Sequence, residues 1–122
     1  MNKLSQAVSI HPYFKLQEGK LDEFKEVIKL FIERTQTEDK CFYYDFSIDT
    51  ESNIVFCREA YEGASGVLAH LDNVGDVIEK ALTISEMTLL EIHGPASEIA
   101  QLREPLADLP VKFYEHIDGA KF

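Results

Sequence analysis

The spacing of hydrophobic residues along the chain switches between the period of a strand and the period of a helix. Positions 7–16 alternate in the manner of a strand, within which Pro12 requires a bulge or an unpaired N–H position. Positions 20–36 instead carry an apolar stripe at helical spacing, formed by Leu21, Phe24, Val27, Ile28, Phe31, Ile32 and Thr35. The first two predicted elements are therefore a strand and an amphipathic helix.

The next segments predict a hairpin followed by a second helical region. Positions 41–49 alternate strictly, polar residues follow, and positions 54–61 return as the partner strand. With the turn centred near Glu51, we expect Phe46 opposite Phe56 and Tyr44 opposite Arg58. Two stretches with helical spacing and a fourth strand then follow, at positions 64–71, 74–82 and 86–93.

This order of elements is typical of an α+β domain of the ferredoxin-like class. Right-handed crossovers place the strands in the order fourth, first, third, second in one antiparallel sheet, with both helical regions on one face. The other face also carries apolar residues and needs a cover. A second copy of the sheet is the simplest cover, so we expect a homodimer that forms a dimeric α/β barrel.

The last part of the chain predicts a helix–strand extension. A short helix is expected at 97–103 and an added strand at 111–117, whose apolar residues need a surface. Either the same subunit or the dimer partner can supply that surface. The length of 122 residues fits one domain, with a core at 7–95 and an extension at 96–122.

Charge and apolar run length narrow the range of partners. The chain has 22 Asp and Glu residues against 12 Lys and Arg residues, so its net charge of −10 disfavours nucleic acid and anionic membrane surfaces. No apolar run reaches the roughly 20 residues of a membrane-spanning helix. Two cysteines and a start without a hydrophobic signal core favour free, structural thiols and a cytoplasmic location.

Three groups of residues carry a resemblance to a known family: Gly19-Lys20-x-x-Glu23-Phe24, Cys41-x-x-Tyr44-x-x-x-x-Asp49, and Glu59-x-Tyr61-Glu62 followed by Ala69-His70-Leu71. Their order and spacing over roughly 8–93 resemble the antibiotic biosynthesis monooxygenase family. The resemblance implies a dimeric α/β barrel and, as in some members, oxygenation of phenols or quinols without a cofactor.

Tyrosine at position 61 is a departure from that family, which commonly has tryptophan there. The haem-degrading relatives use an Asn-Trp-His set around their substrate, and this chain contains no tryptophan. The resemblance therefore does not extend to haem degradation.

A cofactor-free oxygenase needs an apolar slot for a ring, a base for the phenolic proton and donors for the resulting anion. His70 is the candidate base, because its ordinary pKa lies near neutrality and it matches the family pattern. The alternative is a helix histidine that only packs. Tyr44 is the second candidate catalytic residue, and a facing Arg58 would bind a phenolate or carboxylate. Alternatively these two form a cross-strand pair, with Arg58 held by Glu59 or Asp45 of the dimer mate and not by a ligand.

The remaining candidate substrate-binding residues are aromatic or imidazole side chains: His11, Phe46, Phe56 and Tyr61. His11 can line either the cavity or the dimer interface. The four histidines lack metal-ligand spacing, and no phosphate-binding loop is present, so no metal or cofactor is expected. The main hypothesis is a homodimeric, cofactor-independent monooxygenase for a small aromatic molecule. The alternative is a non-catalytic module of the same fold that binds a small ligand or only assembles.

Overall fold

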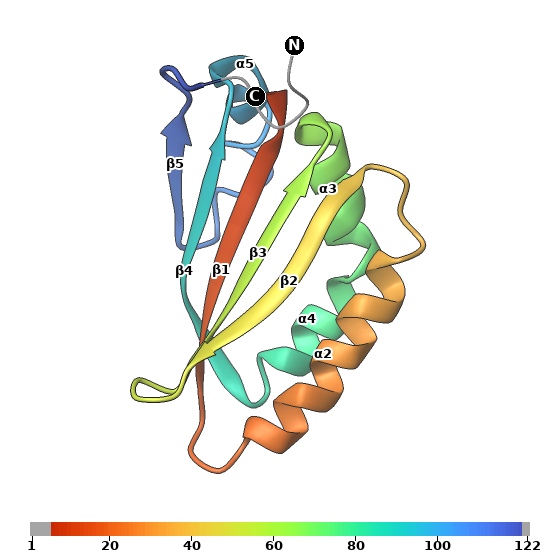
Figure 1. The fold of residues 1–122 in the computed structure, drawn as a ribbon, viewed down its shortest axis with the longest axis vertical. Coiled ribbons are helices and arrows are strands. Elements are labelled where there is room, and N and C mark those ends of the chain that lie inside the picture. The colour runs from red at the N-terminus through yellow and green to blue at the C-terminus, as the bar shows by residue number, and fades with distance from the viewer. Residues whose placement is uncertain (1–5, 121–122) are drawn as a thin grey trace.

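The computed structural model describes residues 6–120, in which five strands form one sheet with helices on one face (Figure 1). The strands are β1 (Val8–Leu16), β2 (Cys41–Asp49), β3 (Ile54–Tyr61), β4 (Ser85–Gly94) and β5 (Val111–Glu115), and the helices are α2 (Leu21–Thr35), α3 (Gly63–Asn73), α4 (Gly75–Ala81) and α5 (Ala96–Ala100). The strand order β2-β3-β1-β4-β5 confirms the predicted ferredoxin-like arrangement. The first four strands pair antiparallel, and β5 pairs parallel with β4.

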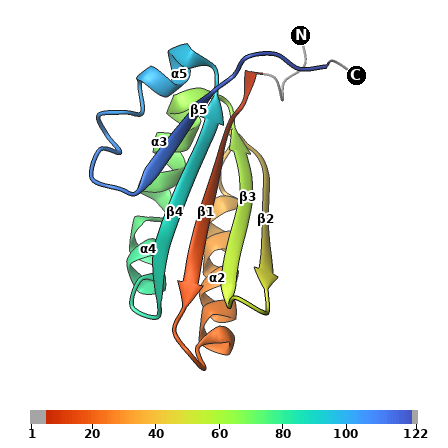
Figure 2. The same cartoon turned by 90° about the vertical axis from the view of Figure 1, so that its left-hand side faces the viewer.

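Helices α2, α3 and α4 cover the sheet face on which the strand alternation gathers apolar residues (Figure 2). The helical stripe of α2 buries Phe24, Val27 and Phe31 against Phe14 and Val55 of the sheet. A second cluster lies under α3 and the C-terminal segment, and includes Val8, Ile10, Tyr61, Val67, Ile92, Leu102 and Leu106. The hydrophobic effect, which favours removal of these side chains from water, is the main force that holds the helices against the sheet.

The hairpin between β2 and β3 corrects the predicted register by one residue. Tyr44 lies opposite Glu59 rather than Arg58, and Phe46 lies opposite Cys57 rather than Phe56. The connecting loop has four residues and closes with a hydrogen bond from Asn53 N to Asp49 O at 2.9 Å. Asn53 has a φ of 60°, which asparagine tolerates better than most residues, and the turn therefore centres one half-residue later than expected.

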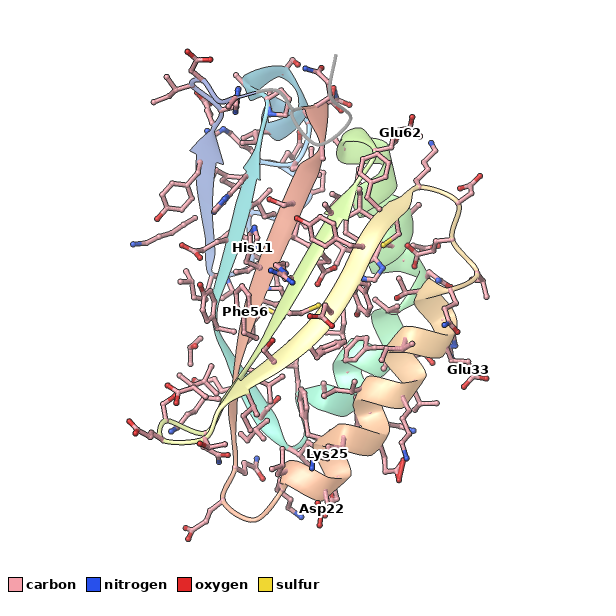
Figure 3. All side chains as sticks on the ribbon, viewed as in Figure 1. His11, Asp22, Lys25, Glu33, Phe56 and Glu62 are labelled. Atoms are coloured by element: carbon pink, nitrogen blue, oxygen red, sulfur yellow. The ribbon has the colours of Figure 1, made fainter. Side chains whose placement is uncertain are left out.

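The open face of the sheet, which we define by Ser9, His11, Tyr13, Phe56 and Arg58, carries no helix among residues 6–120. His11 and Phe56 lie over this face (Figure 3), with their rings stacked 5.8 Å apart. Arg58 faces Asp45 of its own chain at 3.7 Å, and both side chains are exposed. The guanidinium is therefore solvated on the open face beside Asp45 and does not face Tyr44 as the predicted register placed it.

The C-terminal segment, residues 96–115, packs on its own subunit, which was one of the two arrangements left open by the sequence. Its helix α5 and the following turns bury Ile99, Leu102 and Leu106, and β5 continues the sheet beyond β4. No helix among the described residues is long and apolar enough to cross a membrane.

Candidate functional site

A cavity of about 360 Å³ lies between the sheet and helices α2, α3 and α4. Its walls are mostly apolar, with Ile10, Phe14, Phe31, Phe46, Leu71, Val74, Ile78, Met87 and Leu90 among the lining residues. The polar side chains that line it are Tyr44, Glu59, His70, Ser85 and Glu86. A volume of this size suits a small organic molecule, and the few polar groups would fix its orientation.

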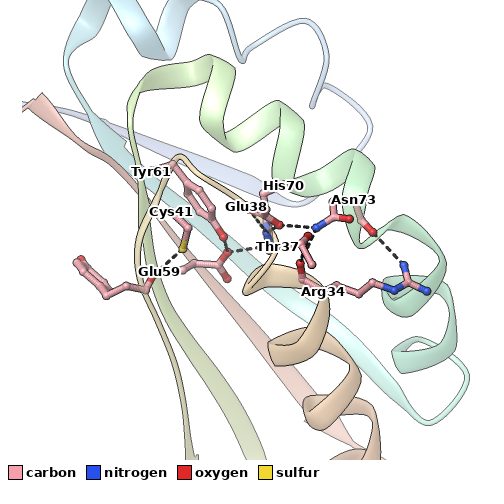
Figure 4. Close-up of polar contacts among 9 residues, drawn as sticks. Arg34, Thr37, Glu38, Cys41, Glu59, Tyr61, His70 and Asn73 are labelled. Atoms are coloured by element: carbon pink, nitrogen blue, oxygen red, sulfur yellow. Dashed lines mark hydrogen bonds and ion pairs between the residues drawn. The ribbon is translucent and has the colours of Figure 1, made fainter.

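At the buried end of this cavity, His70 lies between two carboxylates (Figure 4). Its Nδ1 is 2.9 Å from Glu38 Oε2, and its Nε2 is 3.2 Å from Glu59 Oε1. The hydroxyl of Tyr61 donates to the same Glu59 oxygen. His70 and Glu59 are each only 2% exposed. Helix α3, strand β3 and the turn after α2 thus place one imidazole and two carboxylates in a single buried network.

The network favours the protonated form of the imidazole. Burial alone lowers the pKa of His70, but the hydrogen bonds and negative charges of Glu59 and Glu38 outweigh burial and raise this pKa above its ordinary value. Both ring nitrogens face a carboxylate, and only the imidazolium can donate from both. Burial, followed by the charge of Glu59, raises the pKa of Tyr44 and of Tyr61, so both phenols stay protonated, and the Tyr61 hydroxyl donates to Glu59.

Hydrogen bonds from Asn73, which is itself held by Arg34, fix the position of Glu38. Asn73 Nδ2 donates to Glu38 Oε2 at 2.8 Å and to Arg34 O at 2.9 Å. Arg34 in turn donates to Asn73 O and forms two 2.8 Å hydrogen bonds with Asp76. The end of α2 and the junction of α3 with α4 are therefore tied together behind the imidazole.

The structure brings some of the sequence-predicted residues together and separates others. His70, Tyr44 and Phe46 line the cavity, and Tyr61 reaches it through Glu59. His11, Phe56 and Arg58 lie on the open face, so none of these three lines the cavity. Alternation along β1 and β3 separates the two groups, because successive side chains of a strand point to opposite faces.

Glu59 and Glu38 are site residues that the sequence reasoning did not select. Glu59 shares the helix-facing side of β3 with Val55, Cys57 and Tyr61, and a carboxylate at such a position is a signal of a buried polar site. Glu38 sits in the polar turn after α2, where no sequence signal distinguishes it from its solvated neighbours.

Neither cysteine has the environment of a nucleophile. Cys41 and Cys57 are free. Burial, followed by the charge of Glu38, raises the pKa of Cys41 to about 11, and burial likewise raises that of Cys57. Among residues 6–120, no group of three or more histidine, cysteine or acidic side chains forms a potential metal site. The chemistry that this arrangement offers is proton transfer inside an apolar cavity.

Solved structures resemble this fold to different extents. MupZ from Pseudomonas fluorescens matches it with a TM-score of 0.90 and 34% sequence identity, over 96% of this chain and 95% of that chain. A conserved protein from Methanosarcina mazei Go1 matches with a TM-score of 0.67 and 18% identity, over 75% and 95% of the two chains. A candidate antibiotic biosynthesis monooxygenase from Caulobacter crescentus CB15 matches with a TM-score of 0.65 and 17% identity, over 72% and 88%.

The match to MupZ spans nearly the whole chain, whereas the other two structures leave about a quarter of this chain unmatched. No profile of a known protein family and no curated protein sequence matches the chain.

Proposed function

The chain belongs to the antibiotic biosynthesis monooxygenase family, and from this premise we propose that it oxygenates a small, largely apolar phenol or quinol without a cofactor. The observation that carries the proposal is the Glu59–His70–Glu38 network at the buried end of an apolar cavity. The apolar walls would hold the ring, and the network would take up the phenolic proton.

In this reaction the phenolic hydroxyl lies against Glu59 and His70. Its proton passes to the Glu59 carboxylate, because the imidazolium of His70 already carries a proton on both ring nitrogens and acts as a donor to that carboxylate. The protonated hydroxyl of Tyr44, which lines the same cavity, donates to the phenolate. The electron-rich phenolate then reduces dioxygen. A phenol with a free ring position and one molecule of dioxygen give a quinone and one molecule of water, so no external reductant is needed.

The site geometry favours an enzyme over a non-catalytic module. The cavity is not filled by the C-terminal segment and is lined by both His70 and Tyr44, which a proton-transfer enzyme requires. A module that only binds an apolar ligand gains nothing from two buried carboxylates, because their burial is costly unless they are paired.

The test is oxygen uptake by the pure protein with a panel of naphthols, anthrols and hydroquinones. We expect uptake with at least one compound, and a decrease of about 10²- to 10⁴-fold in His70→Gln and in Glu59→Gln, the usual contribution of a general base. Lys25→Gln, on the outer side of α2, is the control and should keep the wild-type rate. Uptake that both site variants leave unchanged would remove the network from the mechanism.

A second candidate function is an acid–base reaction that consumes no dioxygen. It is favoured by the two carboxylates on opposite sides of one imidazole, since such a set can donate one proton and accept another in the same turnover. Product formation under strict anaerobiosis, with the same loss in Glu59→Gln, would select this function over oxygenation.

We also propose that the protein works as a homodimer. Proteins of this fold family are commonly dimeric. The open face presents a cluster of rings in which Tyr13 and Phe56 lie 4.9 Å apart and His11 and His93 lie 4.5 Å apart. A second copy of the same face would cover these rings and return the sheet to a fully buried state.

A further inference from the structure

The cavity has a buried polar end and an exposed apolar rim. Its lining residues differ in exposure, with Glu59 and His70 almost inaccessible but Leu82 and Leu109 exposed by 44% and 43%. The exposed members mark the opening through which a ligand reaches the network. The C-terminal segment contributes Leu109 and Pro110 to this rim. All the other lining residues lie in β4 or earlier in the chain.

Backbone hydrogen bonds fix this part of the rim. Leu109 N donates to Leu106 O at 3.1 Å, Val111 N donates to Leu109 O at 2.8 Å, and Leu90 N donates to Pro110 O at 3.0 Å. Leu106 is itself buried in the core cluster under α3. The side chain of Leu109 is thus presented from a backbone anchored on both sides, although the side chain itself is half exposed.

The charges around the cavity limit the chemistry of the ligand. Among residues 6–120, no lysine or arginine lines it, and the charged side chain near the rim is the exposed Glu86. The imidazolium of His70 already has a carboxylate at each ring nitrogen. A carboxylate or phosphate on the bound ligand would therefore lose its hydration without gaining a free cationic partner, and Glu59 would repel it.

We propose that the C-terminal segment builds the outer wall of the substrate site and that Leu109 determines specificity by contacting a neutral apolar extension of the substrate. This inference rests on the proposed function for the location of the reacting group. The substrate class is then a neutral, elongated molecule with one hydroxyl-type reacting group at the Glu59–His70 end and an aliphatic or ring extension at the Leu109 end.

The experiment is displacement of the neutral fluorescent probe N-phenyl-1-naphthylamine by 1-alkanols of 6 to 14 carbons. In the wild type, affinity should rise with chain length until the extension passes the rim. Leu109→Ala should weaken binding of the longest alkanols about tenfold and leave that of 1-hexanol within twofold, because hexanol does not reach the rim. Alkanoates of equal length should bind at least tenfold more weakly than the alkanols.

Two further variants complete the design. Ile117→Ala, at a side chain 95% exposed that does not line the cavity, should bind every alkanol like the wild type. In His70→Gln the affinity for alkanols should still depend on chain length, even where turnover is abolished. Turnover therefore tests the proposed function, and the chain-length dependence tests the outer wall.

Equal effects of Leu109→Ala on short and long alkanols, or no effect on either, would overturn the proposal. So would a wild-type protein that binds no alkanol, or one that binds alkanoates as well as alkanols. Thermal unfolding of each variant confirms that the half-exposed Leu109 has been replaced without loss of the fold.

Discussion

At the scale of single residues, the molecule is distinguished by the imidazole of His70 and its two carboxylate neighbours. Each partner comes from a different part of the chain: Glu38 from the turn after α2, Glu59 from β3 and His70 from α3. The network therefore exists only in the folded protein, and its titration reports on the fold and on the proposed reaction together.

Removing one carboxylate should shift the titration of His70. In Glu38→Gln the Nδ1 side of the ring loses a negative charge, so the pKa of His70 should fall from its raised value, because burial is then opposed by Glu59 alone. Titration of the imidazole signals by NMR measures this directly. Glu33→Gln, on the exposed side of α2, also removes one negative charge but away from the network, and it should leave the pKa of His70 unchanged.

The raised pKa of His70 also predicts how stability depends on pH. The folded state binds the imidazolium proton of His70 more tightly than the unfolded state does. The contribution of this proton to the free energy of unfolding is therefore complete below pH 6.5 and is lost as the pH rises through the raised pKa of the folded state. His70→Gln should therefore lower the free energy of unfolding by about 3 kcal/mol near pH 6 and by less at pH 9. Chemical denaturation at both pH values tests this, and a cost that grows with pH would contradict it.

At the scale of elements, close packing of α3 against the sheet decides where His70 lies. A Cβ on Gly66 of α3 would come within 3.0 Å of Tyr61 Cβ and 3.2 Å of Lys40 Cβ. A larger residue at this position must push the helix away from β3, and with it the imidazole from Glu59.

Gly66→Val should accordingly lower the free energy of unfolding by about 1–3 kcal/mol and weaken the His70–Glu59 contact. Gly75→Ala is the matched control, because a Cβ at Gly75 meets no atom within 4 Å and α4 should gain up to about 1 kcal/mol from the better helix former. Urea denaturation of both variants provides the comparison, and equal stabilities would refute the packing argument.

Sequence patterns predicted the elements well because periods of 2 and 3.6 are properties of the backbone. The apolar stripe of α2 and the alternation of β2 are read from the chain alone, and the strand order then follows from the handedness of the crossovers. The site was harder to predict. Because the turn between β2 and β3 centres half a residue later than expected, Glu59 and not Arg58 lies opposite Tyr44. Glu38 acquires its role only through a contact with His70, which is distant in the sequence.

At the scale of the whole molecule, the open face and the cavity lie on opposite sides of the sheet. The homodimer proposed for the open face predicts a mass of twice 13.9 kDa in sedimentation equilibrium. Tyr13→Lys places a charge among the rings of this face and should shift the protein to a monomer. Lys25→Glu, on the outer side of α2, is the control and should remain dimeric. A wild-type protein that sediments as a monomer at micromolar concentration would exclude this assembly.

Because the network and the cavity are complete within one chain, each subunit carries everything that the proposed chemistry requires. Co-expressed mixtures of wild-type and His70→Gln chains should then lose activity in linear proportion to the inactive fraction, with no dominant-negative effect. Assembly and turnover could therefore change independently through substitutions on opposite sides of a single layer of strands.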